Sequence, residues 1–227
     1  MKLYDEVISG AFLRRPNRFI AHVETENGVE ICHVKNTGRC AELLIPGARV
    51  TLSVSHQPKR KTRCDLVAVE KGRLFINMDS QAPNRAAQEA LPRLFPGLTL
   101  LRPETVFGAS RLDFYLEQGE KKTFVEVKGV TLEENGAALF PDAPTERGVK
   151  HLKELEKCVL AGYGAAALFV IQMRGPTRFS PNWNTHPAFG EALRHANQAG
   201  VRLLAYDCLV TPDSMTLRAP VPISLDK

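Results

Sequence analysis

The first third of the chain carries short runs in which apolar and polar residues alternate, the period expected of half-buried strands. Four runs are clear, at residues 18–23, 29–34, 49–54 and 64–69. Asn27-Gly28 separates the first two and is typical of a tight hairpin turn. Around five short strands within residues 1–80 predict a small antiparallel β-barrel, for which the OB type is the leading candidate.

Beyond residue 80 helical periods alternate with strand-like runs. A short helix is expected from Asn84, which would cap it, to Leu91, with Pro92 ending it. Strands are expected at 98–107, 111–117 and 123–132.

A stronger helix opens at Pro144-Thr145-Glu146, carries an apolar stripe and ends near Gly162. The continuous apolar run 165–173 predicts a strand covered on both faces, and helix 187–199 and a last strand 201–206 follow. This order predicts a mixed α/β domain over residues 81–227, after a barrel domain over residues 1–80.

Composition places the chain among globular proteins, with 44% hydrophobic and 24% charged residues. The longest apolar run, 165–171, is far shorter than a membrane-spanning helix, and the N-terminus has no signal-like apolar stretch. We therefore expect a cytoplasmic protein without membrane contact. The five cysteines are odd in number and widely spaced, which favours reduced thiols over a metal site.

The net charge of +5 is unevenly distributed. Residues 1–80 carry 13 Lys and Arg against 9 Asp and Glu, whereas residues 81–227 carry 17 against 16. The basic excess therefore belongs to the predicted barrel. It favours a polyanionic partner, although many proteins that bind no polyanion share such a balance.

Candidate chemistry gathers on two neighbouring strands. Because strand side chains alternate, Glu126 and Lys128 share one face, and the apolar set Leu112, Phe114 and Leu116 leaves Asp113 on the polar face opposite Glu126. Two carboxylates can hold Mg²⁺ or Mn²⁺ while a lysine orients or deprotonates water, which is an apparatus for phosphodiester hydrolysis. The alternative is a solvated cross-strand charge pair.

Several segments resemble the sugar fermentation stimulation protein family over nearly the whole chain. They are Pro16-Asn17-Arg18-Phe19, Asn36-Thr37-Gly38-Arg39, Ser110-Arg111-Leu112-Asp113-Phe114, Glu126-Val127-Lys128, His151-Leu152 and, most specifically, Phe140-Pro141-Asp142-Ala143-Pro144-Thr145-Glu146-Arg147-Gly148. The resemblance implies an OB-like domain, a PD-(D/E)xK nuclease-like domain, non-specific DNA binding and a regulatory role in sugar, notably maltose, metabolism.

Carried over residue by residue, the nuclease pattern assigns Asp113 and Glu126 as metal ligands and Lys128 as the lysine. Leu112 stands where the pattern often has proline, which weakens the literal motif. Glu104 would add a third carboxylate or be a surface acid. Asp142 would cap the following helix or reach the metal, and capping is preferred.

Arg147, His151 and Glu154 recur at helical spacing and form a polar stripe. Beside the acids, Arg147 would bind a phosphate and His151 would assist proton transfer as a further catalytic residue. A solvated helix edge is the alternative.

Basic residues gather at the predicted barrel loops, where they suit phosphate contacts. The candidates for nucleic-acid binding, two of them in the second domain, are Arg14, Arg15, Arg18, Lys35, Arg39, Lys59, Arg60, Lys61, Arg63, Arg111 and Arg147.

These features favour a protein that binds DNA mainly through phosphates, with weak sequence specificity, and that carries a metal site of nuclease type. Two alternatives stay open: an active metal-dependent nuclease of DNA or RNA, and a non-catalytic transcriptional regulator. The sequence leaves strandedness and oligomeric state open.

Overall fold

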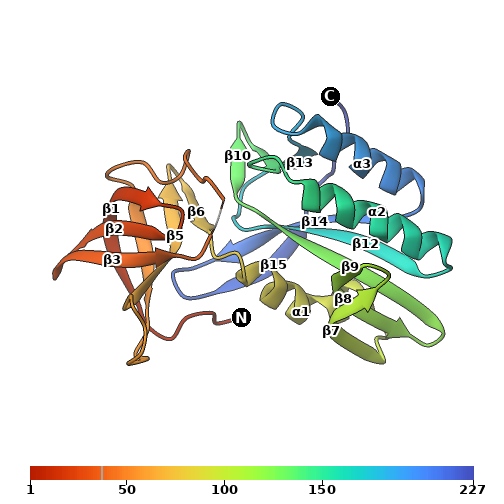
Figure 1. Ribbon diagram of the computed structural model, residues 1–227, viewed down its shortest axis with the longest axis horizontal. Coiled ribbons are helices and arrows are strands. Elements are labelled where there is room, and N and C mark those ends of the chain that lie inside the picture. Colours follow the sequence, from red (N-terminus) through yellow and green to blue (C-terminus); the bar gives the residue numbers. More distant parts are fainter. Residues whose placement is uncertain (37) are drawn as a thin grey trace.

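The alternating runs at the start of the chain form a closed barrel in a computed structural model that describes residues 1–36 and 38–227 (Figure 1). Thr37, part of one family segment, lies outside the described residues. The strands are β1 (Val7–Asn17), β2 (Ile20–Thr25), β3 (Gly28–Val34), β4 (Arg49–Val54), β5 (Cys64–Lys71) and β6 (Leu74–Asn77). Their order is β3-β2-β1-β4-β5-β6, and a parallel β3–β5 pairing closes the barrel as an OB fold requires.

The barrel differs from the sequence prediction at its first strand. β1 was not expected, because two irregularities on either side of Arg14 break its alternation. β2 begins at Ile20 rather than at residue 18, because the Asn17 side chain accepts the backbone N–H groups of Phe19 and Ile20 and so makes a turn.

The second part of the chain is built on a mixed six-stranded sheet. Its order is β15-β14-β12-β9-β8-β7, with β9, β12 and β14 parallel and the remaining pairs antiparallel. The strands are β7 (Leu100–Phe107), β8 (Ser110–Gln118), β9 (Lys121–Val130), β12 (Gly164–Ile171), β14 (Arg202–Val210) and β15 (Met215–Pro220). A smaller sheet joins β10 (Leu132–Glu134), β11 (Ala137–Phe140) and β13 (Arg178–Pro181).

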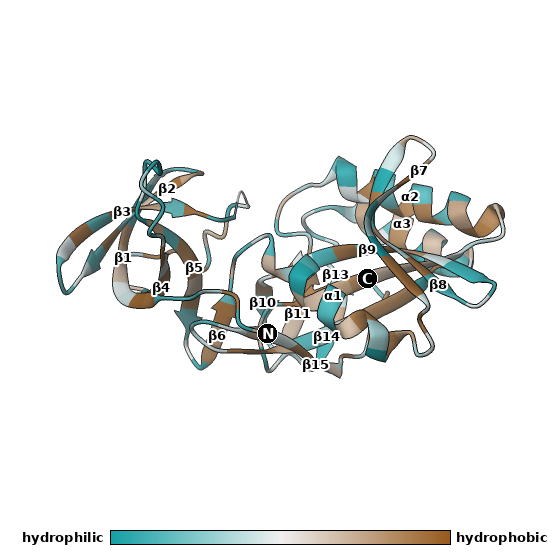
Figure 2. Ribbon diagram, turned by 90° about the horizontal axis from the view of Figure 1, so that it is seen from below, coloured by the Kyte–Doolittle hydropathy of each residue, from teal (hydrophilic) through white to brown (hydrophobic). Residues whose placement is uncertain are grey.

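Helices cover both faces of the large sheet. Helix α1 (Ala82–Leu94) packs on one face, and α2 (Glu146–Leu160) and α3 (Pro187–Gln198) pack on the other. Figure 2 shows hydrophobic colouring along the strands of this sheet. Within the described residues, none of the helices combines the length and apolar character needed to span a bilayer.

Three expectations for this part are wrong. Helix α1 begins before Asn84, which does not cap it, and Pro92 lies inside the helix near its end. Strand 201–206 continues to Val210 and is not the last, since β15 follows it. The strands of the small sheet were also missed, because three or four residues are too few to establish a period.

A buried polar cluster, here called the domain junction, ties the barrel to the second part. The amide nitrogen of Gln172 donates to the backbone oxygens of Asn77 and Asp79, at 3.0 and 3.1 Å. Asp79 in turn accepts hydrogen bonds from Tyr4 and the ammonium of Lys35. Burial raises the pKa of Tyr4, which keeps the phenol a donor. The junction therefore fixes how the two parts sit together.

We expect Gln172→Leu to lower the free energy of unfolding by about 3 kcal/mol, because it leaves buried carbonyl oxygens without a donor. Urea denaturation followed by circular dichroism measures this change. Gln198→Leu, at an exposed position on α3, should change stability by less than about 0.5 kcal/mol. Equal effects of the two substitutions would contradict a stabilising role for the junction.

Candidate functional site

The acidic residues meet where the β8–β9 ladder ends. The last paired residues are Phe114 and Val125, so Asp113 and Glu126 occupy the next positions on the two strands. Leu112 packs in the core under α2, whereas Phe114 packs in the core under α1. The expectation that Leu112, Phe114 and Leu116 share one face is therefore wrong, because β8 turns as it leaves the ladder.

Asp113 bridges the gap that the ladder leaves. Its Oδ2 accepts the backbone N–H of Val127 at 2.7 Å, and its Oδ1 accepts the side-chain amide of Asn84, from α1, at 2.8 Å. Burial raises the pKa of Asp113, and the neighbouring charge of Glu126 raises it further, against these two hydrogen bonds. A bound cation, in addition to the charge of Lys128, would stabilise the ionised form of Asp113.

Glu126 is held from the other layer, by α2. Its Oε1 accepts the ammonium of Lys128 at 2.7 Å and contacts Nδ1 of His151. Burial by itself would raise the pKa of Glu126, but the hydrogen bond to His151 and the charge of Lys128 hold that pKa below its ordinary value. Glu126 is therefore an ionised carboxylate in a buried position.

The tautomer of His151 follows from its neighbours. Arg147 Nε lies 3.3 Å from Nε2 of His151 and can only donate, so Nε2 is the acceptor nitrogen. The ring proton then sits on Nδ1 and is donated to Glu126. His151 and Glu154 are buried, so the predicted polar stripe is not a solvated edge of α2.

One oxygen of this cluster has no partner. Oε2 of Glu126 is buried and receives no hydrogen bond from any described residue. A buried acceptor of this kind needs a donor or a cation to offset its lost hydration. No group of three or more His, Cys, Asp or Glu residues suited to a metal occurs among the described residues. Two carboxylates with water and phosphate oxygens are nevertheless an ordinary Mg²⁺ environment, so the residues fit such an ion.

The other acids predicted near the site lie elsewhere. Glu104 is exposed and pairs with Arg111 at 3.4 Å, as its reading as a surface acid requires. Glu154 pairs with Lys157. Asp142 does not cap α2, because Thr145 is the cap and accepts the backbone N–H of Gly148.

The predicted phosphate-binding residues divide into two groups. Arg15 donates to the backbone carbonyls of Asn36, Gly38, Arg39 and Arg18. Lys35, Arg60 and Arg63 pair with Asp79, Asp65 and Glu30. The other group is exposed and forms no ion pair within the described chain: Arg14, Arg18, Arg39, Lys59 and Lys61. Outside the barrel, Arg111 pairs with Glu104, whereas Arg147 is exposed. Within the barrel, only the second group has its charge available for a ligand.

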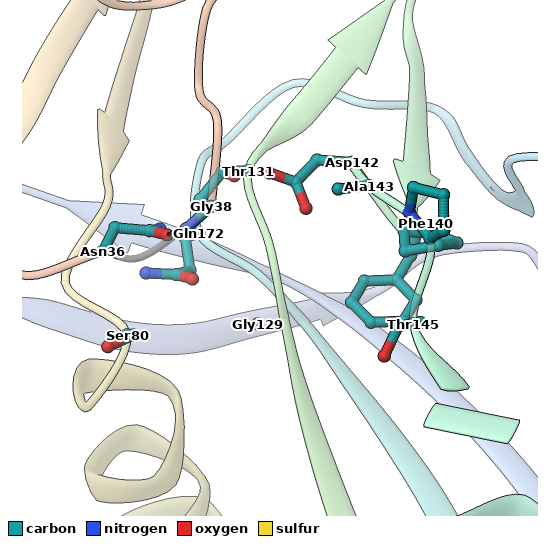
Figure 3. A pocket seen from close by; sticks show the side chains of 12 residues that line it. Asn36, Gly38, Ser80, Gly129, Thr131, Phe140, Asp142, Ala143, Thr145 and Gln172 are labelled. Atoms are coloured by element: carbon teal, nitrogen blue, oxygen red, sulfur yellow. Dashed lines mark hydrogen bonds between the residues drawn. The ribbon is translucent and has the colours of Figure 1, made fainter. Parts of the chain in front are cut away.

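A polar pocket of about 310 Å³ lies near the carboxyl end of β9, beyond Lys128 (Figure 3). It opens between the barrel loop at Asn36 and Gly38 and the segment 140–145, and Gly129 of β9 forms part of its wall. Sequence reasoning missed this pocket and the role of Asn84. The one available signal was the family segment Phe140–Gly148, which was more specific than a helix start requires.

We expect Lys128→Met to destabilise the metal-free protein by about 3 kcal/mol, because it leaves the buried charge of Glu126 without its ammonium. Adding Glu126→Gln should recover much of this loss, which a double-mutant cycle by urea denaturation measures. Lys153→Met, on the exposed side of α2, serves as the control. Additive effects of the two site substitutions would count against their coupling.

Comparison with known proteins identifies the family. The model described as "SfsA N-terminal OB domain" matches residues 13–78, and that described as "Sugar fermentation stimulation protein RE domain" matches residues 81–214. A sugar fermentation stimulation protein homolog from Clostridium beijerinckii is 51% identical, covering 98% of this chain and 99% of its own, and one from Desulfitobacterium hafniense is 57% identical over 93% of each.

Among solved structures, SfsA of Pyrococcus furiosus in complex with Ca²⁺ superposes with a TM-score of 0.88, at 28% identity over 99% of both chains. The mixed α/β architecture predicted from the sequence, an OB barrel followed by a domain with a mixed central sheet, is confirmed. The chain therefore belongs to the sugar fermentation stimulation protein (SfsA) family.

Proposed function

We propose that this protein binds DNA in the cytoplasm, mainly through phosphates, and that Asp113 and Glu126 hold a divalent cation for phosphodiester hydrolysis. The observation that carries the proposal is the buried, unpartnered Oε2 of Glu126 beside a second carboxylate. In a purely structural ion pair, both oxygens would have found donors.

The cation would be Mg²⁺ or Mn²⁺, held by the two carboxylates. When bound, it would neutralise phosphate charge and acidify a bound water. The SfsA structure from Pyrococcus furiosus contains Ca²⁺, which prefers the same oxygen ligands and so supports a hard-cation site in this family.

The side chains of this protein would then divide the work. Lys128 is partly exposed, with 15% of its side chain accessible, and would orient the attacking water. His151 would fix Glu126 through Nδ1, and Arg147, exposed at the start of α2, would bind a phosphate oxygen. Proton transfer by His151 itself stays a prediction, because both ring nitrogens already have neighbours.

DNA would enter along the barrel loops that carry the available charges. Arg18 lies in the loop between β1 and β2, with its guanidinium 4.9 Å from the centre of the exposed Phe19 ring, and Lys59 and Lys61 lie in the loop between β4 and β5. These two loops border the face that OB folds use for nucleic acids. Contacts of this type carry little sequence information, so we infer weak specificity.

A non-catalytic regulator is the second candidate. The printed names of the relatives connect them with sugar fermentation, which suits a role in regulating sugar metabolism. In that case the acids and lysine would stabilise the fold or a bound ion without strand scission.

For DNA binding, we expect the logarithm of the association constant to fall linearly as the logarithm of salt concentration rises. Lys59→Ala combined with Lys61→Ala should weaken binding to all sequences and reduce the slope by about 2, since each phosphate contact contributes about 0.9. Fluorescence anisotropy with duplex and single-stranded oligonucleotides measures both effects. Arg49→Ala, at the opposite end of β4, is the control. An association constant that does not change with salt concentration would overturn the proposal that DNA is bound through its phosphates.

For catalysis, we expect strand scission with Mn²⁺ or Mg²⁺ that falls at least about 100-fold in Asp113→Ala and in Lys128→Ala. Gel assays on single- and double-stranded DNA and on RNA measure scission, and thermal unfolding confirms that each variant folds. Scission that survives both substitutions would place the activity elsewhere. DNA binding without scission in any metal would favour the regulator.

A further inference from the structure

The polar pocket near the carboxyl end of β9 has no role in the proposed hydrolysis. Its wall includes Gln172 from the domain junction, Thr131, and Asp142 with Phe140 from the family segment (Figure 3). Elements of both parts of the chain therefore meet around one space.

Two glycines let polar side chains of the wall pack closely against the backbone. A Cβ atom on Gly129 would lie 2.5 Å from Oε1 of Gln172, and one on Gly38 would lie 2.6 Å from a carboxylate oxygen of Asp142. Any side chain at either position would displace a polar group of the wall. Glycine within a strand, as at Gly129, is expected where another group approaches the backbone closely.

Three polar groups of the wall have no hydrogen-bond partner among the described residues. Thr131 and Gln172 are more than nine-tenths buried, yet no described residue hydrogen-bonds the Thr131 hydroxyl or donates to Gln172 Oε1. Asp142 has no hydrogen bond or ion pair with any described residue, and its carboxylate points into the space (Figure 3). The oxygens of Asp142 and Gln172 can only accept hydrogen bonds, so a ligand that fits them presents donors such as N–H groups. A phosphate would be repelled by Asp142.

Two elements lead from the pocket to the acidic cluster. Along β9, Gly129 lies three residues from Glu126, which corresponds to about 10 Å. Along α2, Thr145 lies six residues from His151, which corresponds to about 9 Å. A single nucleotide spans such a separation from the outer edge of its base to its phosphate.

We propose that this pocket receives an unpaired guanine base of the bound strand, so that the preferred substrate is single-stranded or has an extruded nucleotide. The ring N–H and exocyclic amino group of guanine present paired donors that match both oxygens of Asp142. Phe140 supplies an aromatic wall for the ring. This assignment rests on the proposed function, because it places the base next to the phosphate that the cluster would cleave.

Calorimetric titration of the metal-free, full-length protein with guanosine 5′-monophosphate tests the pocket directly. We expect binding that is about tenfold weaker for inosine 5′-monophosphate, which lacks the amino group, and weaker still for uridine 5′-monophosphate. Asp142→Asn should reduce guanosine monophosphate affinity about tenfold or more. Glu134→Gln, which changes an exposed acid on β10, should leave it unchanged.

Equal binding of the three nucleotides, or binding unaffected by Asp142→Asn, would overturn the pocket assignment. Titration with Ca²⁺ or Mg²⁺ alone supplies the remaining arm: heat that disappears in Asp142→Asn but persists in Asp113→Ala would make the pocket a cation site and overturn the base. These titrations contain no DNA and do not measure strand scission. If the protein binds guanosine monophosphate but shows no salt-dependent DNA binding, the proposed function is overturned and the pocket assignment is not.

Discussion

The amide of Gln172 is the contact on which the arrangement of this protein depends. It donates to buried carbonyl oxygens on the segment that leaves the barrel. Gln172 itself directly follows β12, a parallel strand in the centre of the second domain's sheet. Hydrogen bonds require close and directed contact, so this amide fixes both distance and orientation. Together with the contact of Lys71 with Glu133 on β10, it holds the barrel loops and the acidic cluster in one arrangement.

Strand β9 then gives that fixed arrangement its chemistry. Its alternation presents Glu126 and Lys128 to α2, while Val125 and Val127 pack in the core under α1. Gly129 has no side chain, so the backbone of β9 borders the pocket at this position. One strand thus carries the charged site and, a few residues later, part of the pocket wall.

The sequence predicted whatever depends on local pattern. The start of α2 near Thr145, the hairpin after β2 and the shared face of Glu126 and Lys128 all follow from neighbouring residues. It did not reveal contacts between distant segments. Arg15 and Lys59 look alike in the sequence, yet the fold surrounds Arg15 with carbonyl oxygens and leaves Lys59 exposed. The pocket was missed for the same reason, since Gly38 and Asp142 meet only in the folded chain.

The carboxylate of Asp113 has a further consequence for reading other sequences of this family. Its side chain accepts the backbone N–H of Val127, a group that the β8–β9 ladder leaves unpaired. The sheet therefore needs this carboxylate even in a protein without catalytic activity. A relative that had lost every activity would still be under pressure to keep an aspartate here. The presence of this residue is therefore poor evidence that a given relative is an enzyme.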